Sequence, residues 1–285
     1  MNPANHASRL MIVTGDDFGC SNLVNRAIIE AHKRGILTTA SLMVNGDAFE
    51  EAVALAHAHP RLSVGLHLVV ICGRATLPAG RIPLLAAPLG RFSDSPVRAG
   101  LRYQFNRLAQ EQLRLEIRAQ LEKFHRTGLQ LSHVDGHLHM HLHPVVLKAL
   151  IDLAGEFGIG AIRLPGEELG MTLRLDRSDS LRKVIYSWVF NRLRLCGGRR
   201  LKAARIQFTD RVYGLLQTGR MTEEYLLGLI PKIRASRVEI YSHLSTAELE
   251  AYLSPRVRVA LDASGFQLAT YETVKGCMAC ESSLR

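Results

Sequence analysis

Short apolar segments that favour β-strands alternate with helical patterns along almost the whole chain, and this alternation restricts the possible folds most. We predict strands at residues 10–14, 38–44, 62–68, 129–134, 161–164, 204–209, 238–242 and 266–270. Helical patterns follow most of them, for example at 21–34, where apolar residues recur every three or four positions. This order predicts an α/β fold with a parallel sheet, and about eight strands fit a distorted (β/α) TIM-like barrel. A doubly wound open sheet is the alternative.

The composition is that of a globular protein with one packed core. The chain has 285 residues, of which 47% are hydrophobic. It shows no internal repeat and no Pro- or Gly-rich linker that would separate two domains. We therefore predict a single domain over residues 10–275, with an amphipathic helical insertion around 170–205 and tails at 1–9 and 276–285.

The sequence also bears on compartment and redox state. No stretch reaches the ~18 apolar residues of a membrane-spanning helix, and the first residues lack the apolar core of a signal peptide. We expect a cytoplasmic protein, with peripheral contact at the inner membrane as the open alternative. The five cysteines are odd in number and scattered, which argues against a disulfide framework. We interpret the isolated pair Cys277 and Cys280 as part of the C-terminal tail.

Polar residues follow several predicted strands at the point where each strand ends. Asp16 and Asp17 follow the first strand, His67 lies in the third, and His243 follows the seventh. Carboxyl ends of parallel strands meet at one edge of a sheet, where the active sites of α/β proteins are built. Taken alone, these residues are also compatible with a polar turn, but two adjacent carboxylates repel each other, which a turn does not require. They favour a site in which one carboxylate binds a cation and the other acts as a base.

A histidine-rich segment at 132–143 is the strongest local signal. Histidines and one carboxylate occupy its alternate positions: His133, Asp135, His137, His139, His141 and His143. On an extended backbone these side chains would share one face. Imidazole is a ligand for zinc and its transition-metal neighbours, so we predict a metal site here. Histidines that do not bind the metal would orient its ligands or contact the substrate.

Two histidines and one carboxylate leave open coordination positions, as a catalytic metal requires. Such a metal polarises a carbonyl group and lowers the pKa of bound water. A neighbouring carboxylate then accepts the proton of the water, and a distant acid protonates the leaving group. His243 suits the role of that acid. We expect one divalent ion, with zinc first; nickel, cobalt and manganese also fit these ligands, and magnesium fits them less well.

The chain resembles the YdjC-like carbohydrate deacetylases, the ChbG type, from Ile12 to about Val274. The matching motifs are Asp16-Asp17-Phe18-Gly19, Ser41-Leu-Met-Val-Asn45-Gly46, Gly65-Leu66-His67, His133-x-Asp135-x-His137-x-His139, Tyr213-Gly214, Tyr241-Ser-His243 and Gly265-Phe-Gln-Leu-Ala-Thr-Tyr271. The resemblance implies a distorted (β/α) barrel, often dimeric, that hydrolyses the acetamide group of N-acetylglucosamine units.

The resemblance also implies roles for individual residues. It carries metal binding to Asp17, His67 and His137, the role of the base to Asp16, and the role of the acid to His243. We expect further residues to orient the ligands or contact the substrate: His133, Asp135, His139 and Tyr213.

One motif departs from the family pattern. The family often has Cys-His-Pro around the last histidine, where this chain has Ser242-His243-Leu244. The histidine is kept in different surroundings, so its role as the acid depends on those surroundings.

Positive charge is concentrated in one segment. The formal net charge is +10, and residues 181–205 hold eight basic side chains and no acidic one. Apolar residues in the same segment would form one helix face: Leu181, Val184, Ile185, Trp188 and Val189. A basic amphipathic helix with a tryptophan is typical of membrane-surface binding. A lid helix packed on the barrel, with a solvated basic rim, is the alternative.

Within the family the chain most resembles the hopanoid-biosynthesis-associated branch, HpnK. That resemblance implies an N-acetylglucosaminyl hopanoid, a sugar on a lipid, as the substrate. Nucleic-acid binding has only the charge in its favour, because the sequence has no recognisable motif for it. Two other functions stay open: a metal-dependent phosphoesterase or amidohydrolase on a (β/α) barrel, and a non-catalytic metal-binding protein.

Overall fold

The computed structural model describes residues 9–276. Its strands are β1 (Arg9–Phe18), β2 (Thr39–Leu42), β3 (Ser63–Leu68), β4 (Val134–Gly136), β5 (Arg211–Tyr213), β6 (Arg237–Ser242) and β7 (Phe266–Ala269). Its α-helices are α1 (Asn22–Arg34), α2 (Phe49–Ala58), α3 (Pro96–Phe105), α4 (Arg107–His125), α5 (Pro144–Phe157), α6 (Leu169–Leu175), α7 (Ser180–Ala203), α8 (Glu223–Leu229), α9 (Thr246–Leu253) and α10 (Pro255–Ala263). Arg9, predicted in the tail, begins β1. The remaining predicted tail residues, apart from Gly276, and the Cys277–Cys280 pair lie outside the described residues.

The strands form one parallel sheet in the order β4-β3-β2-β1-β6-β5, with β7 beside β1. β1 is the longest strand and lies at the centre of the sheet. Its first residues pair with both β6 and β7, and its carboxyl-terminal half pairs with β2 and β6. Met11, Ile12 and Val13 are fully buried, as expected for a strand that is covered on both faces. The carboxyl end of β1 therefore lies between those of its neighbours, where the predicted site residues follow.

Within residues 9–276 the regular sheet is not a complete (β/α) barrel, which corrects the predicted TIM-like barrel. The predicted strands at 161–164 and 204–209 contribute only isolated bridges, including Val134 to Ile162 and Ala161 to Gln207. Pro165 has no amide N–H to donate to a ladder. Arg205 has a φ of 58°, which extended strands do not allow. Irregular chain therefore spans the gap between β4 and β5.

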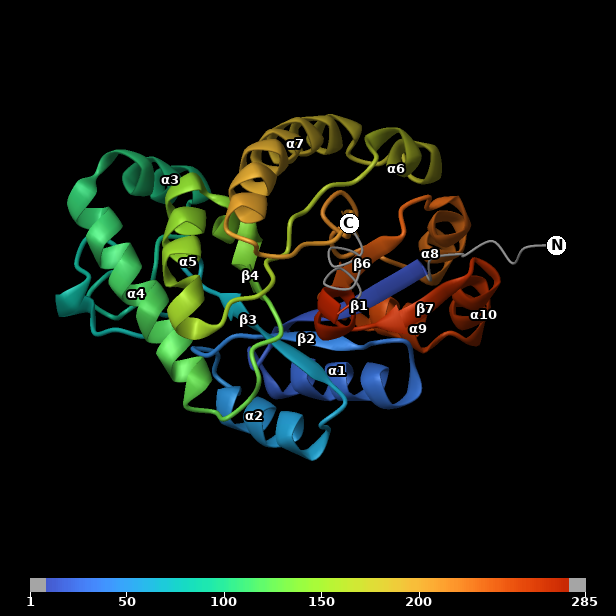
Figure 1. Ribbon diagram of the computed structural model, residues 1–285, viewed down its shortest axis with the longest axis horizontal. Coiled ribbons are helices and arrows are strands. Elements are labelled where there is room, and N and C mark those ends of the chain that lie inside the picture. Colours follow the sequence, from blue (N-terminus) through green and yellow to red (C-terminus); the bar gives the residue numbers. More distant parts are fainter. Residues whose placement is uncertain (1–8, 277–285) are drawn as a thin grey trace.

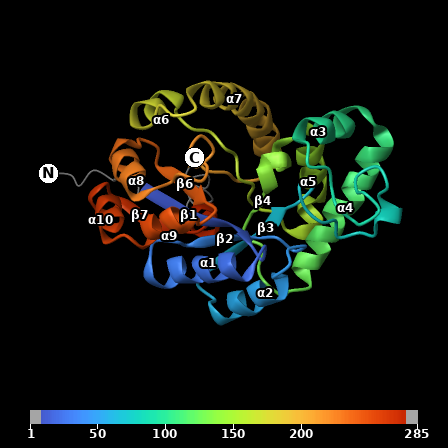
Figure 2. The same cartoon turned by 180° about the vertical axis from the view of Figure 1, so that it is seen from behind.

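Helices surround the curled sheet (Figures 1 and 2). In Figure 1, α1 and α2 lie below it, α3 to α5 lie on its left, and α8 to α10 lie on its right. The predicted helix at 21–34 is confirmed, because α1 begins after Ser21, whose Oγ accepts the N–H of Val24. Pro144 occupies the first turn of α5, also as predicted. This arrangement leaves the carboxyl edge of the sheet facing α7.

The predicted insertion forms α6 and α7, and α7 arches over the sheet on the side opposite α1 and α2 (Figure 1). Two basic residues of α7 are not part of the solvated basic rim that the lid-helix alternative predicts. Lys183 is buried, with its Nζ 2.8 Å from a carboxylate oxygen of Asp176. Arg194 donates to the backbone carbonyls of Leu164, Thr209 and Asp210. No helix in the described part of the chain is long and apolar enough to cross a membrane.

Candidate active site

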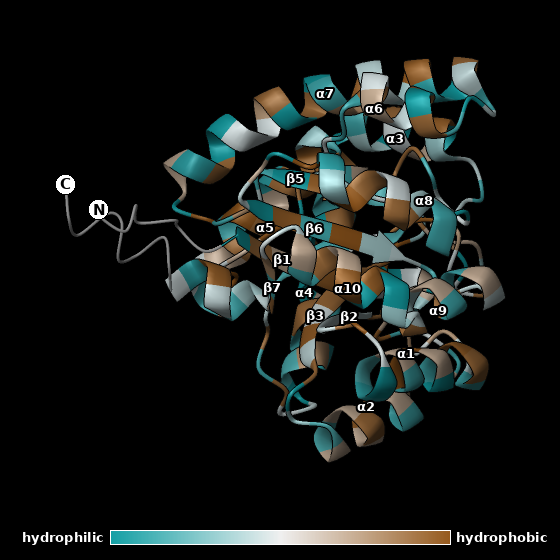
Figure 3. Cartoon of the chain, turned by 90° about the vertical axis from the view of Figure 1, so that its right-hand side faces the viewer, coloured by the Kyte–Doolittle hydropathy of each residue, from teal (hydrophilic) through white to brown (hydrophobic). Residues whose placement is uncertain are grey.

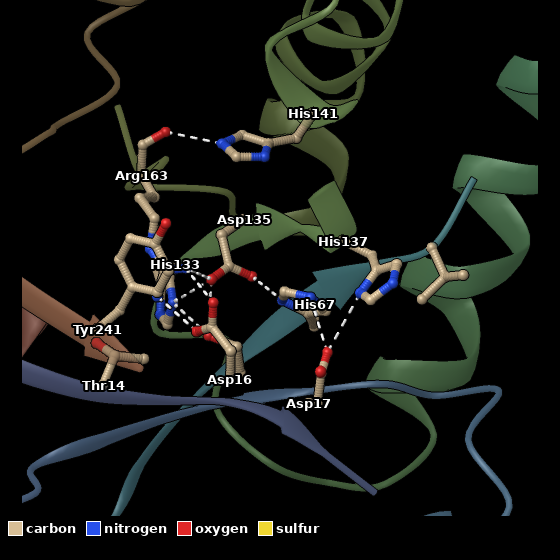
Figure 4. A network of polar contacts seen from close by, with 12 residues as sticks. Thr14, Asp16, Asp17, His67, His133, Asp135, His137, His141, Arg163 and Tyr241 are labelled. Carbon is tan, nitrogen blue, oxygen red and sulfur yellow. Dashed lines mark hydrogen bonds and ion pairs between the residues drawn. The ribbon is translucent and has the colours of Figure 1, made fainter. Parts of the chain in front are cut away.

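The end of β1 sends two adjacent carboxylates in different directions. Asp16 is buried and faces Arg163, whereas Asp17 faces His67 and His137 (Figure 4). Adjacent side chains of a strand point to opposite faces, and Asp17 in addition has a φ of 63° at an irregularity in the pairing of β1 with β2. Such a conformation is costly for a residue other than glycine and recurs at functional sites. The two carboxylates therefore have separate partners, as their predicted separate roles require.

Asp17, His67 and His137 come together from β1, β3 and the residue that follows β4. The Oδ1 of Asp17 lies 3.3 Å from Nε2 of His67 and 3.3 Å from Nδ1 of His137. All three atoms are buried, and none has a well-formed hydrogen bond among the described residues. Buried polar atoms without such a partner are costly. Three of them that converge on one point have the arrangement expected of metal ligands, and the predicted trio fits one ion.

Asp135 fixes the orientation of His67. The Nδ1–H of His67 donates to Oδ1 of Asp135 over 2.8 Å, so its Nε2 points toward Asp17 (Figure 4). A carboxylate behind a histidine in this way selects the tautomer that offers Nε2 as a ligand. Burial opposes a charge on His67, but the carboxylates of Asp135 and Asp17 outweigh it and hold the pKa of His67 well above its usual range. The surroundings of this imidazole thus favour a cation at Nε2, either a proton or a metal.

The balance of charge in the site also favours a cation. Burial alone would raise the pKa of Asp17, but contacts with His137 and His67 outweigh it and hold the pKa well below its usual range. Three further carboxylates, those of Asp16, Asp135 and Glu239, are buried nearby around one guanidinium. Buried charges are stable only when they are compensated. A divalent ion between Asp17 and the two histidines would offset much of this negative charge.

Arg163 supplies the guanidinium, and the sequence analysis did not select it. It is fully buried and forms a two-pronged ion pair with Asp16, with Nη1–Oδ2 and Nη2–Oδ1 distances of 2.7 and 2.9 Å. It also contacts Asp135 and Glu239 and lies 4.5 Å from the centre of the Tyr241 ring. The planar fork of arginine matches a carboxylate in this way, so it fixes the orientation of Asp16. The sequence did contain a signal for this role, because Arg163 is a charged residue within the otherwise apolar strand predicted at 161–164.

The histidine-rich segment does not have the extended backbone on which its alternate side chains would share one face, and the strand predicted at 129–134 is observed at Val134–Gly136. β4 ends at Gly136, and Leu138 and His139 have φ values of 49° and 56°. These left-handed residues break the alternation, so the histidines point in different directions. His141 Nε2 donates to the carbonyl of Arg163, and His143 caps α5 and donates to the carbonyl of Gly100.

His133 and His139 support the site from two sides. His133 stacks on Tyr271 with 4.3 Å between ring centres and lies 3.2 Å from the hydroxyl of Ser41, which donates to Asp135. His139 Nε2 lies 2.7 Å from the hydroxyl of Tyr241. His133 is thus close to Asp135, and His139 lines the cavity described below.

His243 and Tyr213 have different places. His243 follows β6, lines the same cavity as Asp16 and His67, and lies with its ring centre 6.2 Å from that of Tyr241. Tyr213 is buried, donates to Glu168 and is not among the residues that line this cavity. The structure therefore brings His243 to the site and leaves Tyr213 away from its open space.

A cavity of about 550 Å³ opens above these residues. Polar groups of the site form its floor, including Asp16, His67 and His243. The part of its lining that comes from α7 includes Arg182 but is otherwise largely apolar: Ile185, Tyr186, Val189, Phe190 and Leu193. A site with this shape can hold a polar reacting group against its floor and an apolar group against α7.

Comparisons with known proteins agree with the motifs and the fold. A family described as "YdjC-like protein" matches residues 10–264. A carbohydrate deacetylase of Brevibacillus brevis is 43% identical over 155 residues, which are 54% of this chain and 59% of that protein. A chitooligosaccharide deacetylase of Escherichia fergusonii is 34% identical over 159 residues, 55% of this chain and 59% of the relative. The alignments thus span less than two thirds of these relatives.

A solved structure shares the fold over almost its whole length. It is a protein of Enterococcus faecalis V583, described provisionally as a cellobiose-phosphate cleavage protein, and it is 23% identical to this chain. The superposition has a TM-score of 0.71 and covers 94% of this chain and 99% of the other. At this level of identity the similarity shows the α/β fold alone.

Proposed function

The chain belongs to the YdjC-like family, and from this premise we propose that it is a hydrolase that removes the acetyl group from an N-acetylated sugar. One observation carries the proposal: Asp17, His67 and His137 converge with buried, unsatisfied ligand atoms. Of these three residues, His67 lines the same cavity as Asp16 and His243. The names of the relatives, carbohydrate and chitooligosaccharide deacetylase, support the same reaction.

We propose that Asp17, His67 and His137 hold one divalent ion, with zinc expected first. Such an ion, when bound, polarises the acetamide carbonyl and lowers the pKa of water. Asp135 keeps Nε2 of His67 directed at the ion by holding its Nδ1–H. The ligand set of two imidazoles and one carboxylate also accepts nickel, cobalt or manganese, and magnesium less readily.

Asp16 is proposed as the base. Its carboxylate is fixed by Arg163 at the floor of the cavity, so it can accept the proton of a water molecule that attacks the acetamide carbon. His243 also lines the cavity and is proposed as the acid, which gives a proton to the departing sugar nitrogen. Arg163 acts through Asp16 and is a positioning residue.

The substrate is proposed to be a sugar linked to a lipid, as in the hopanoid-associated HpnK branch, with an N-acetylglucosaminyl hopanoid as the specific case. The largely apolar wall that α7 contributes to the cavity supports this proposal. A free sugar would expose hydroxyl groups to that wall without hydrogen-bond partners, which disfavours binding. A lipid-linked sugar would bury apolar surface there. Peripheral membrane contact and a homodimer remain predictions.

Metal analysis together with turnover tests the proposal. The purified chain should bind about one zinc ion and release acetate from an N-acetylated chitooligosaccharide, faster still from an N-acetylglucosaminyl lipid. The His137→Ala variant should lose both metal and turnover, whereas a His57→Ala control, far from the site on α2, should keep both. Two metals per chain with phosphate-ester cleavage would favour a phosphoesterase. Stoichiometric metal without turnover on either sugar would favour a metal-binding protein.

A further inference from the structure

Helix α3 carries large apolar side chains on the side that faces solvent. Val97, Leu101 and Phe105 recur every four residues and are 72%, 56% and 77% exposed. Ala99 and Tyr103, on the opposite side of the helix, are buried and anchor it. A surface helix normally turns its apolar stripe toward the core. The stripe on α3 has no partner in the described part of the chain that would account for it.

Helix α7 has a similar stripe on its outer side. Leu181, Trp188 and Leu195 are seven residues apart and are 74%, 65% and 64% exposed. Arg192 and Arg199 belong to the same stripe by helical spacing, and both are exposed. This face differs from the one that lines the cavity, so α7 is apolar on two sides. Packing over the active site explains only one of them.

The stripe on α3 reaches the mouth of the cavity, and the outer stripe of α7 runs along the same helix as the face that lines the cavity. Val97 on α3 and Ile185 on α7 both line the cavity and are both exposed, so they mark its opening. Figure 3 shows α3, α6 and α7 along the same edge of the molecule. Exposed apolar side chains grouped in this way mark an interaction site. Whatever covers this surface therefore also covers the route into the cavity.

The charges identify the partner. Residues 95–110, which include α3, contain three arginines and no acidic residue. Residues 181–205 contain no acidic residue and eight basic residues, of which Lys183 and Arg194 are held inside and the other six are exposed. A second copy of the chain docked through the same face would place like charges opposite one another. An anionic lipid surface would attract the cations and accept the apolar side chains. We propose that α3 and the outer stripe of α7 form a docking surface for an anionic lipid bilayer, with the cavity mouth facing the lipid.

Vesicle binding tests this proposal without reference to the reaction. The full chain is mixed with vesicles of phosphatidylcholine alone or with phosphatidylglycerol, and the bound fraction is measured by co-sedimentation. Binding to the anionic vesicles should be at least tenfold stronger and should fall at least tenfold between 0.1 and 1 M salt. The double variant Phe105→Ser/Trp188→Ser should bind at least tenfold more weakly. It should still deacetylate a soluble sugar at the wild-type rate, because neither residue lines the cavity.

Matched controls come from the other side of the molecule. Val259→Ser on α10 removes an equally exposed apolar residue and should leave vesicle binding unchanged. Arg98→Gln/Arg192→Gln should weaken binding to anionic vesicles, whereas Arg26→Gln on α1 should not. Equal binding of Phe105→Ser/Trp188→Ser and wild type would overturn the proposal, as would indifference of the wild type to anionic vesicles. A dimer in analytical ultracentrifugation that this double variant abolishes would assign the surface to a second copy instead.

Discussion

At the scale of single residues, the site depends on backbone conformations that most side chains avoid. Asp17, Leu138, His139 and Leu244 all have φ values between 49° and 63°, and all lie within the segments that form the site. Each such residue costs of order 1–3 kcal/mol, which the surrounding structure must offset. The conformation at Asp17 matters most, because this residue carries the carboxylate oxygen that faces both His67 and His137.

The separate roles of these carboxylates give a prediction for two variants. Asp16→Asn should keep its metal but lose a factor of ~10²–10⁴ in turnover, because an amide cannot accept the proton of water. Asp17→Asn should lose metal, because its Oδ1 is the atom that faces both histidines. Elemental analysis and acetate release measure the two effects. Metal loss in Asp16→Asn with retention in Asp17→Asn would exchange the two roles.

At the scale of elements, β3 and β4 approach each other too closely for side chains at some positions. A Cβ at Gly65 of β3 would lie 2.2 Å from Nδ1 and 2.7 Å from the carbonyl oxygen of His133. His133 is stacked on Tyr271 and bonded to Ser132, so it has no free space to move into. The glycine therefore allows the close packing that places His133 and Asp135 behind His67.

Two glycine variants should have opposite effects on stability. Gly65→Ala should lower the free energy of unfolding by about 1–3 kcal/mol, through overpacking against His133. Gly155→Ala, in α5, should raise it by about 0.5–1 kcal/mol, because a Cβ there meets nothing within 4 Å and alanine favours the helix. Urea denaturation measures both. A stable Gly65→Ala variant would mean that β3 and β4 can separate without cost.

A carboxyl group that is buried against the turn after β5, that of Glu167, should oppose folding when it ionises. Glu167 accepts the N–H groups of Gly214 and Leu216, while its other oxygen is buried without a hydrogen bond. Burial raises the pKa of Glu167 to about 7, although the backbone N–H groups act in the opposite direction. In the unfolded chain this carboxyl titrates near 4.5. Between these two pH values the Glu167 carboxyl is therefore protonated in the folded chain and ionised in the unfolded chain.

The sign of this effect follows from linkage. A raised pKa contributes stability below pH 4.5, and that contribution is lost as the pH rises toward about 7, by roughly 3 kcal/mol in all. A Glu167→Gln variant has no such group. The unfolding free energy of the wild type, minus that of the variant, should therefore fall between pH 4.5 and about 7. Above about pH 7 this difference should stay constant. Parallel pH profiles for the two proteins would show that Glu167 is ionised in the folded state.

At the scale of the whole molecule, the curled sheet collects negative charge at its carboxyl edge while α7 covers the edge with apolar and basic residues. Strands β1, β3, β4 and β6 are spread across the sheet order, and each contributes a residue to the site from its carboxyl end. The cavity thus combines a charged floor with an apolar roof. This combination supports a substrate that has both a polar and a lipid part.

Because the proposed metal ligands come from β1, β3 and the segment after β4, a bound metal should stabilise the entire fold. Zinc at a hundredfold excess over its Kd should raise Tm by roughly 5–10 °C over the protein treated with EDTA. The His137→Ala variant should show little of this increase. Differential scanning calorimetry measures the shift. An equal shift in the variant would place the stabilising ion at another part of the chain.

The sequence alone determined which residue types end each strand, because strand pattern and strand-end chemistry are local properties. It predicted the parallel α/β fold and the placement of Asp16, Asp17, His67 and His243 at one edge. Alternation did not reveal how the side chains from His133 to His143 point, because positive φ values at Leu138 and His139 interrupt the extended backbone on which they would share a face.

Only the tertiary structure decided how these groups are paired. Arg163 meets Asp16 across 147 positions of sequence, and Asp135 meets His67 across 68. These pairings depend on sheet register and on the close approach of strands, which local patterns do not encode. The same holds for the incomplete barrel and for the two apolar sides of α7. Periodicity gives the angles of side chains around a helix, but only packing decides which of those angles face the cavity and which face solvent.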